Sequence, residues 1–142
     1  MGEISLDDIL IAPLACIPTA GGNVLHALKQ DDIGYSSFGE AYFSWVEIGV
    51  VKGWKRHTQM TMNLVVPVGN VRFVFCMGNA EGYRTEEIGI DRYMRLTVPP
   101  GIWFSFQGRV DPKSLVLNIA SIQHDPNEAQ RLELSEFEYD WS

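Results

Sequence analysis

Three basic residues and a histidine lie close together near the middle of the chain. Lys52, Lys55 and Arg56 are three of the eleven lysine and arginine residues in a protein of net charge −7, and His57 follows them directly. A histidine can transfer a proton near neutral pH, whereas cations can bind an anion or stabilise a developing negative charge. The segment Gly49–His57 is therefore the clearest indication of chemistry in the sequence.

Short apolar and aromatic segments surround this cluster, and turn signals separate them. The segments with strand character are 24–29, 38–46, 50–54, 60–66, 71–77, 93–98, 102–107 and 114–121. In one of them Val71, Phe73, Phe75 and Met77 alternate with other residues, as in a half-buried strand. No window carries a helical repeat of useful length. The pattern predicts an all-β sandwich or barrel, and the length of 142 residues predicts a single domain over residues 1–142.

Composition excludes several classes of function. A net charge of −7 and an isoelectric point near 4.8 argue against a nucleic-acid surface, which needs a broad basic face. No stretch approaches the ~20 apolar residues that cross a membrane, and the first residues lack the pattern of a signal peptide. Cys16 and Cys76 lie far apart, which predicts two reduced thiols. We expect a cytoplasmic protein without nucleic-acid or membrane partners.

The acidic C-terminal tail carries two local signals. Asp125 can cap a turn at its start, and Phe137, Tyr139 and Trp141 alternate near its end. Large aromatic side chains at alternating positions are typical of a segment that packs on the domain. We therefore expect the tail to dock.

The glycine and proline spacing resembles that of the cupins, a family of jelly rolls, or double-stranded β-helices. Gly49, five residues, Lys55, Arg56, His57, four residues, Met62, six residues and Gly69 follow the spacing of the first cupin motif, and Pro99-Pro100-Gly101 resembles the second. Lys55, Met62 and Phe104 stand where the motifs have metal-binding His, Glu and His. An ammonium, a thioether and a phenyl ring do not suit a hard or borderline cation. The resemblance thus implies a cupin fold without a metal or other cofactor.

Residues 38–108 also resemble a particular branch of cupins, namely the dTDP-4-dehydrorhamnose 3,5-epimerases and related nucleotide-sugar ketoisomerases. Gly49-Val-Val-Lys52-Gly53-Trp-Lys55-Arg-His57 is similar to the Gly-Val-(Val/Leu)-Arg-Gly-Leu-His segment of the epimerases and to Arg-Gly-any-His-Ala-His of the ketoisomerases. The resemblance places Lys52 at the diphosphate-binding Arg, Lys55 at the usual base, and His57 at the second ketoisomerase His.

The resemblance also implies roles for residues outside this segment. Ser44 falls where the epimerases have a serine, and Glu40 and Tyr42 occur where they have side chains near the sugar. Tyr42 is also a candidate for the catalytic acid, together with Tyr83 and Tyr93, which the sequence cannot rank. Arg72 lies in an apolar strand, where it binds substrate or pairs with a carboxylate.

The implied chemistry is removal of a proton next to a sugar ketone. His57 or Lys55 would be the base, and Lys52, Lys55 or Arg56 would stabilise the enolate and the diphosphate. A lysine acts as a base only when burial or positive neighbours lower its pKa, whereas the pKa of a histidine already lies near the working range. Strand alternation carried on from Lys55 and His57 would place polar residues 59, 61 and 63 inside the barrel and Met60, Met62 and Leu64 outside.

These observations lead to one main hypothesis and two alternatives. The main hypothesis is a homodimeric, metal-independent epimerase or ketoisomerase of a nucleoside-diphosphate 4-keto-6-deoxy sugar, in surface-polysaccharide or deoxysugar synthesis. The substrate, the pathway and the dimer are what the resemblance implies. The first alternative is a non-catalytic cupin that binds a nucleotide sugar or related carbohydrate, which Lys55 at the base position favours. The second is a metal-dependent cupin oxygenase or isomerase.

Overall fold

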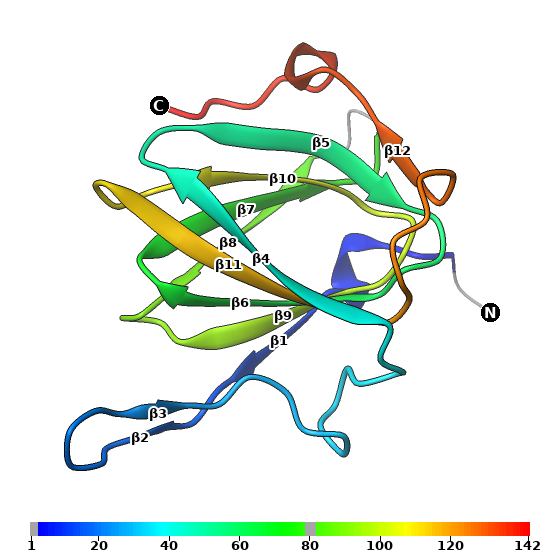
Figure 1. Cartoon of the computed structure of the whole chain (residues 1–142). Coiled ribbons are helices and arrows are strands. Elements are labelled where there is room, and N and C mark those ends of the chain that lie inside the picture. Colours follow the sequence, from blue (N-terminus) through cyan, green and yellow to red (C-terminus); the bar gives the residue numbers. More distant parts are fainter. Residues whose placement is uncertain (1–2, 79–81) are drawn as a thin grey trace.

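Two antiparallel five-stranded sheets face each other in the computed structural model, which describes residues 3–78 and 82–142 (Figure 1). The first sheet has the order β1 (Leu10–Pro13), β9 (Met94–Val98), β6 (Met62–Val68), β11 (Lys113–Ala120) and β4 (Glu40–Glu47). The second has the order β12 (Ala129–Arg131), β5 (Val51–His57), β10 (Trp103–Gly108), β7 (Asn70–Cys76) and β8 (Tyr83–Gly89). The fold is the cupin jelly roll, which confirms the predicted all-β class.

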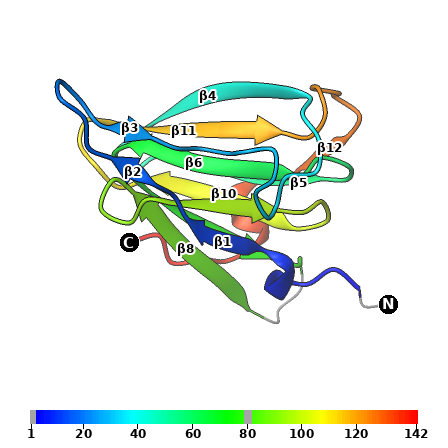
Figure 2. The same cartoon turned by 90° about the horizontal axis from the view of Figure 1, so that it is seen from below.

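The remaining elements are short and lie outside the two sheets. A hairpin of β2 (Cys16–Ile17) and β3 (Val24–Leu25) projects from the body of the molecule (Figures 1 and 2). The helices are the 3-10 turns η1 (Leu6–Asp8) and η2 (Leu134–Glu136). Within the described residues, therefore, no helix is long and apolar enough to span a membrane.

The core fills the space between the two sheets. Val71, Phe73 and Phe75 of β7 are 1% exposed or less and point into it, and Met77 packs against the same cluster. This confirms the predicted alternation of that strand. Polar residues of β7 such as Arg72 occupy the opposite face of the second sheet.

The alternation predicted for β6 is wrong. Met62 and Leu64 belong to the core cluster, whereas the side chain of Asn63 lies on the other face and donates a hydrogen bond to the carbonyl of Gly34 at 3.1 Å. The reason is the bend at Thr58–Gln59, which interrupts the extended chain between β5 and β6. A bend restarts the inside–outside phase, so the parity of β5 does not carry over to β6.

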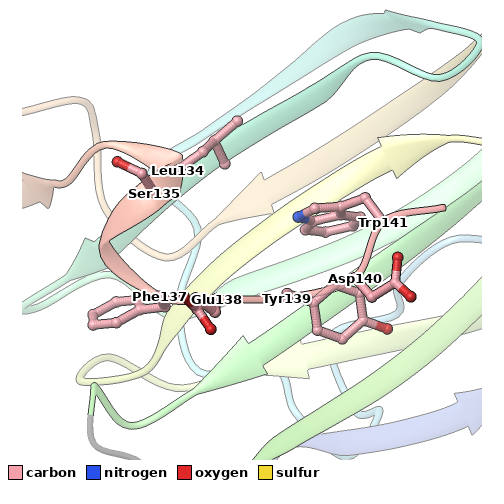
Figure 3. Close-up of a pocket in the computed structure, with 7 residues that line it drawn as sticks. All are labelled: Leu134, Ser135, Phe137, Glu138, Tyr139, Asp140 and Trp141. Atoms are coloured by element: carbon pink, nitrogen blue, oxygen red, sulfur yellow. The ribbon is translucent and has the colours of Figure 1, made fainter.

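The C-terminal tail docks on the outer side of the second sheet, as predicted (Figures 1 and 3). Phe137, Tyr139 and Trp141 pack against a buried cluster that consists of Trp54, Val74, Cys76 and Trp103. The ring of Phe137 makes edge contacts with the rings of Trp54 and Trp103 at centroid distances of 5.4 and 5.7 Å. The predicted turn at the start of the tail is also present, because the carboxylate of Asp125 accepts the N–H of Asn127 at 3.0 Å.

Candidate active site

A β-bulge in β5 turns both Lys52 and Lys55 toward the interior. Residues three apart in a regular strand point to opposite faces. Here the pairing with β10 skips one residue: Ser105 is opposite Gly53 and Phe104 is opposite Lys55, so Trp54 is the extra residue. Gly53 has φ +138°, and a Cβ there would lie 2.6 Å from Ser105 Oγ. Only glycine fits at this bulge without a shift of the neighbouring strand.

The interior between the sheets contains a cavity of about 240 Å³. Three cationic side chains line it, Lys52 and Lys55 from β5 and Arg131 from β12. Its other polar groups come from the first sheet and are Tyr42, Ser44 and Asn118. The remaining walls are largely apolar and include Met62, Leu64, Phe104, Phe106 and Val116. A mostly apolar pocket with a few convergent polar groups is typical of a small-molecule site.

Exposure falls along β5 and so defines the mouth and the floor of this site. Lys52 is exposed, and its ammonium donates a hydrogen bond to the carbonyl of Trp45 at 2.7 Å. Lys55 is half-buried, and His57 is 4% exposed. His57 does not itself line the cavity, but its ring stacks on Phe104, a wall residue, at 6.0 Å. The imidazole thus lies against a wall residue of the cavity and outside its lining.

His57 is held by a glutamate that the sequence analysis did not identify. The Nδ1 atom of His57 lies 2.8 Å from Oε1 of Glu128, and both side chains are at most 4% exposed. The other carboxylate oxygen of Glu128 accepts the backbone N–H groups of Thr58, Gln59 and Met60, each at 2.9 Å. These hydrogen bonds fix the carboxylate, which in turn fixes the orientation of the imidazole.

The charges of this pair follow from its surroundings. Burial alone would raise the pKa of Glu128, but the hydrogen bonds from Gln59, His57 and Met60 outweigh it and lower the pKa to about 2. Burial lowers the pKa of His57, and this effect exceeds the opposing effect of Glu128. At neutral pH the pair is therefore a carboxylate and a neutral imidazole. Because a carboxylate only accepts hydrogen bonds, the imidazole proton lies on Nδ1 and Nε2 keeps its lone pair.

Two buried polar side-chain atoms have no hydrogen-bond partner among the described residues, and both belong to this region. They are Nε2 of His57 and Oδ1 of Asn118. The amide of Asn118 donates to the hydroxyl oxygen of Tyr42 at 3.0 Å, which leaves the Tyr42 proton free to be donated elsewhere. Unsatisfied buried polar atoms are rare in folded proteins. A polar ligand bound in the cavity could satisfy Oδ1 of Asn118, because Asn118 lines the cavity.

The residues that stand at the cupin metal-ligand positions converge in space. Lys55, Met62 and Phe104 all line the cavity, and His57 contacts Phe104. The residues at the four motif positions therefore lie in or beside one cavity. An amine, a thioether and a phenyl ring do not fit a divalent metal, and the described residues contain no group of three or more His, Cys, Asp or Glu side chains that could hold one.

Two of the predicted substrate-binding residues lie on the outer face of the second sheet, away from this cavity. Arg56 is on the outer face of β5, with its guanidinium over the ring of Trp103 at 4.7 Å and a 2.7 Å hydrogen bond to Gln130. Arg72 is on the outer face of β7 and pairs with Glu87 at 3.3 Å. Strand alternation separates Arg56 from its neighbours Lys55 and His57, so the basic cluster of the sequence is split between two faces.

The structure places Glu40 near the site and distinguishes the three tyrosines that were predicted as candidate acids. Glu40 precedes Tyr42 on the inner face of β4, and its charge acts on Lys55, although it does not line the cavity. Tyr42 lines the cavity, whereas the hydroxyl groups of Tyr83 and Tyr93 donate to backbone carbonyls elsewhere. Of the three candidate acids, the structure brings Tyr42 to the site.

A second, more open hollow lies along the tail and has a different character (Figure 3). Its volume is about 720 Å³, and residues of the tail itself line it. Its charged groups are Glu138 and Asp140, so it offers no cation to a phosphate. The inner cavity is therefore the better candidate for an anionic ligand.

Of three comparisons with known proteins, the one with solved structures found similar proteins. Neither a protein-family model nor a curated protein matches the sequence. A dTDP sugar isomerase from Desulfovibrio desulfuricans G20 has a similar structure, with a TM-score of 0.88 and 34% identity over 95% of this chain and 91% of that chain.

Two further structures share the fold at lower identity. One is a dTDP-4-dehydrorhamnose 3,5-epimerase from Sulfolobus tokodaii, with a TM-score of 0.80 and 18% identity over 97% of this chain and 84% of that one. The other is a sugar 3,4-ketoisomerase from Thermoanaerobacterium thermosaccharolyticum in complex with TDP, with a TM-score of 0.77 and 16% identity over 93% of each chain. On the 34% identity that extends over nearly its whole length, this chain belongs to the dTDP-sugar isomerase family of cupins.

Proposed function

We propose that this protein is a metal-independent epimerase or ketoisomerase that acts on a nucleoside-diphosphate 4-keto-6-deoxy sugar. The observation that carries the proposal is the buried His57–Glu128 pair with a free Nε2 lone pair beside a cationic cavity. This is the arrangement of a general base whose tautomer is fixed by a carboxylate. The family relationship supports the same reaction class, because the relatives described above are a dTDP sugar isomerase, a dTDP-4-dehydrorhamnose 3,5-epimerase and a sugar 3,4-ketoisomerase that binds TDP.

The depth order of the side chains suggests how the substrate binds. Lys52 at the mouth and Arg131 on β12 can take the diphosphate, which carries the negative charge of the substrate. The sugar then extends inward past Lys55. Because the ketone lies across the ring from the carbon that bears the diphosphate, the ketone and its neighbouring carbons are the part that reaches the inner end.

His57 then acts as the base for the proton next to the ketone. Its Nε2 takes this proton, Lys55 stabilises the charge that develops on the carbonyl group, and Tyr42 is the acid. Asn118, with its unpaired Oδ1, accepts a hydrogen bond from a sugar hydroxyl. Arg56 and Arg72 have no part in this scheme, because they lie on the outer face of the second sheet.

Proton exchange tests the proposal directly. The protein is mixed with dTDP-4-keto-6-deoxyglucose in deuterated buffer, and NMR follows the sugar protons. We expect deuterium to enter at C3 or C5, the carbons next to the ketone. Binding without exchange would replace the enzyme with a non-catalytic cupin that recognises a nucleotide sugar. The absence of both exchange and binding would mean that the substrate class is wrong.

We further propose that residues 1–142 form one domain that works as a cytoplasmic homodimer in deoxysugar or surface-polysaccharide synthesis.

An exposed apolar surface on the first sheet supports the dimer. Phe43 and Trp45 of the edge strand β4 are 62% and 47% exposed, and they pair across the sheet with Leu117 and Leu115. Exposed apolar patches of this kind often mark contacts between proteins. Light scattering should give twice the chain mass, and Phe43→Asp should give monomers; a monomeric native protein would refute the dimer.

A further inference from the structure

Lys55 is an amine with no fixed partner inside a mostly apolar cavity. Among the described residues it makes no hydrogen bond and no ion pair, whereas Lys52 is bound to a backbone carbonyl. Met62, Leu64 and Phe104 form part of the wall around it. A lysine that serves only to attract an anion is usually hydrated or paired, and Lys55 is neither fully exposed nor paired.

Burial, more than the neighbouring charges, shifts Lys55 toward its neutral, nucleophilic form. Burial and the nearby charge of Arg131 lower the pKa of Lys55, and Glu128 and Glu40 oppose this effect without outweighing it. The residues that line the cavity include three cations and no carboxylate. Arg131 cannot lose its proton and Lys52 is exposed, so Lys55 is the member of the three that can become neutral. The diphosphate would oppose this, but Lys52 and Arg131 can pair with its charge.

We propose that Lys55 forms a covalent imine with C4 of the keto sugar, and that the protein is therefore an epimerase rather than a 3,4-ketoisomerase. This inference rests on the proposed function, which supplies the ketone. Lysines in apolar pockets or next to another cation are the ones that form Schiff bases with carbonyl substrates. Lys55 satisfies both conditions and lies in the cavity where the ketone would be bound.

The steps balance without any further reactant. The lone pair of the Lys55 amine forms a bond to C4, and the π electrons of the carbonyl move to oxygen, which takes a proton from Tyr42. The amine nitrogen gives up one of its two protons to the new hydroxyl group, which leaves as water, so a protonated imine and a Tyr42 phenolate remain. The proton that Lys55 loses on becoming neutral restores the Tyr42 hydroxyl. Counted from the ammonium form of Lys55, the sum is ammonium plus ketone giving iminium plus water, so no net proton is gained or lost.

The iminium then replaces the ketone as the electron acceptor. His57 Nε2 takes the proton from the neighbouring carbon, and the electrons of the C–H bond form an enamine. Tyr42 donates a proton to the opposite face, which gives the epimer, and water releases it as a ketone. Solvent then takes the proton from His57 and restores that of Tyr42. Transfer of the ketone to C3 is excluded on this path, because it would leave C4 as a secondary amine that water cannot cleave from Lys55.

Oxygen exchange distinguishes this path from simple enolisation. The native protein and dTDP-4-keto-6-deoxyglucose are incubated in buffer made with both D₂O and H₂¹⁸O, and the label on each product is followed by NMR and mass spectrometry. An imine must replace the C4 oxygen by solvent oxygen, whereas an enolate keeps it. We expect ¹⁸O at C4 at a rate comparable to deuterium uptake, above the background without enzyme, and a 4-keto epimer as product. Cyanoborohydride should also trap the sugar on Lys55, which peptide mapping would locate.

Two outcomes overturn the inference in different ways. Deuterium uptake without ¹⁸O above background, or a 3-keto product, would refute the imine and leave the proposed function standing. The absence of deuterium and of ¹⁸O would refute both. Lys55→Arg keeps the positive charge but cannot form an imine, so its ¹⁸O uptake should fall to background and its turnover by at least ~10²-fold. Arg56→Lys, on the outer face of the same strand, is the matched control and should still be trapped at Lys55.

Discussion

Lys55 and Arg56 are neighbours in the chain but lie in opposite environments on the two faces of β5. On the inner face, Lys55 lines a cavity without a fixed partner, and beside it His57 keeps an unpaired Nε2. On the outer face, Arg56 lies over Trp103 and donates a hydrogen bond to Gln130. The aromatic and charged groups of the outer face are packed and paired, whereas the inner face has a cavity and unsatisfied polar groups.

The outer face of β5 therefore contributes mainly to stability, and its inner face mainly to function. Filled volume and paired polar groups stabilise the fold, and empty volume with unpaired groups has a cost that a ligand can remove. Residues of the outer face should therefore affect unfolding more than turnover. Residues of the inner face should do the reverse.

The largest expected effect is on turnover at His57. His57→Gln removes the base and should lower turnover in the proton-exchange assay by at least ~10²-fold, the usual scale for an acid–base group. Arg56→Gln, one residue away on the outer face, is the matched control and should change turnover by less than about 2-fold. Near-ultraviolet circular dichroism would verify that both variants fold. Unimpaired turnover in His57→Gln would remove this residue from the mechanism.

A somewhat smaller effect is expected at Glu128. Glu128→Gln keeps an oxygen for the backbone N–H groups but can present an amide N–H to Nδ1 of His57, which would place the imidazole proton on Nε2. With a proton on Nε2, the imidazole cannot take a proton from the substrate there until the ring rotates or exchanges that proton. We expect turnover to fall by roughly 10- to 10²-fold with little change in KM. Equal turnover in the variant and the native protein would show that the pair is structural.

The sequence predicted most of the fold but not the strands that depend on distant partners. The apolar strands β6, β7, β10 and β11 were found because alternation and β-branched content are local signals. β8 was missed, because it is an edge strand rich in Arg and Glu that pairs on one side only, with β7. β12 was missed because the short segment Ala129–Arg131 has no strand signal and is ordered by its pairing with β5.

The same limit applies to the candidate site. Lys55 and Tyr42 were predicted from motif positions, and both line the cavity. Glu128 is 71 residues from His57, and Arg131 is more distant still, so no local spacing could connect them. The turn capped by Asp125 was predicted, and an acidic residue at the end of a capped turn was the available signal for Glu128. The placement of Lys52 on the same face as Lys55 depends on the bulge at Trp54, which the sequence pattern did not reveal.

The outer face should show the opposite behaviour in a stability measurement. Phe137→Ala removes a half-buried ring that contacts Trp54 and Trp103, and it should lower the free energy of unfolding by roughly 2 kcal/mol. Urea titration at several protein concentrations would measure this effect. Turnover at low temperature should stay within about 3-fold of the native value, because the inner face is untouched. A variant with native stability but strongly reduced turnover would contradict the separation of the two faces.

The smallest effect concerns pH, and it tests whether Glu128 is held as a carboxylate in the folded protein. The pKa of Glu128 is about 2 in the folded protein, against an ordinary value of 4.5, so the folded state holds the proton less tightly than the unfolded state does. The pair therefore stabilises the fold fully above about pH 4.5, and this stabilisation is lost as the pH falls toward about 2.

Other carboxylates titrate in the same range. The difference in the free energy of unfolding between the native protein and Glu128→Gln therefore isolates this group. That difference should shrink by roughly 1 kcal/mol between about pH 5 and pH 4 and should continue to shrink below it. His57, whose pKa is also lowered, has the same sign, because below its ordinary value of 6.5 the unfolded state takes up a proton that the folded state resists. If the difference in the free energy of unfolding stayed constant from about pH 5 to pH 3, Glu128 would not be held as a carboxylate. The reason for placing the free lone pair on Nε2 of His57 would then be lost.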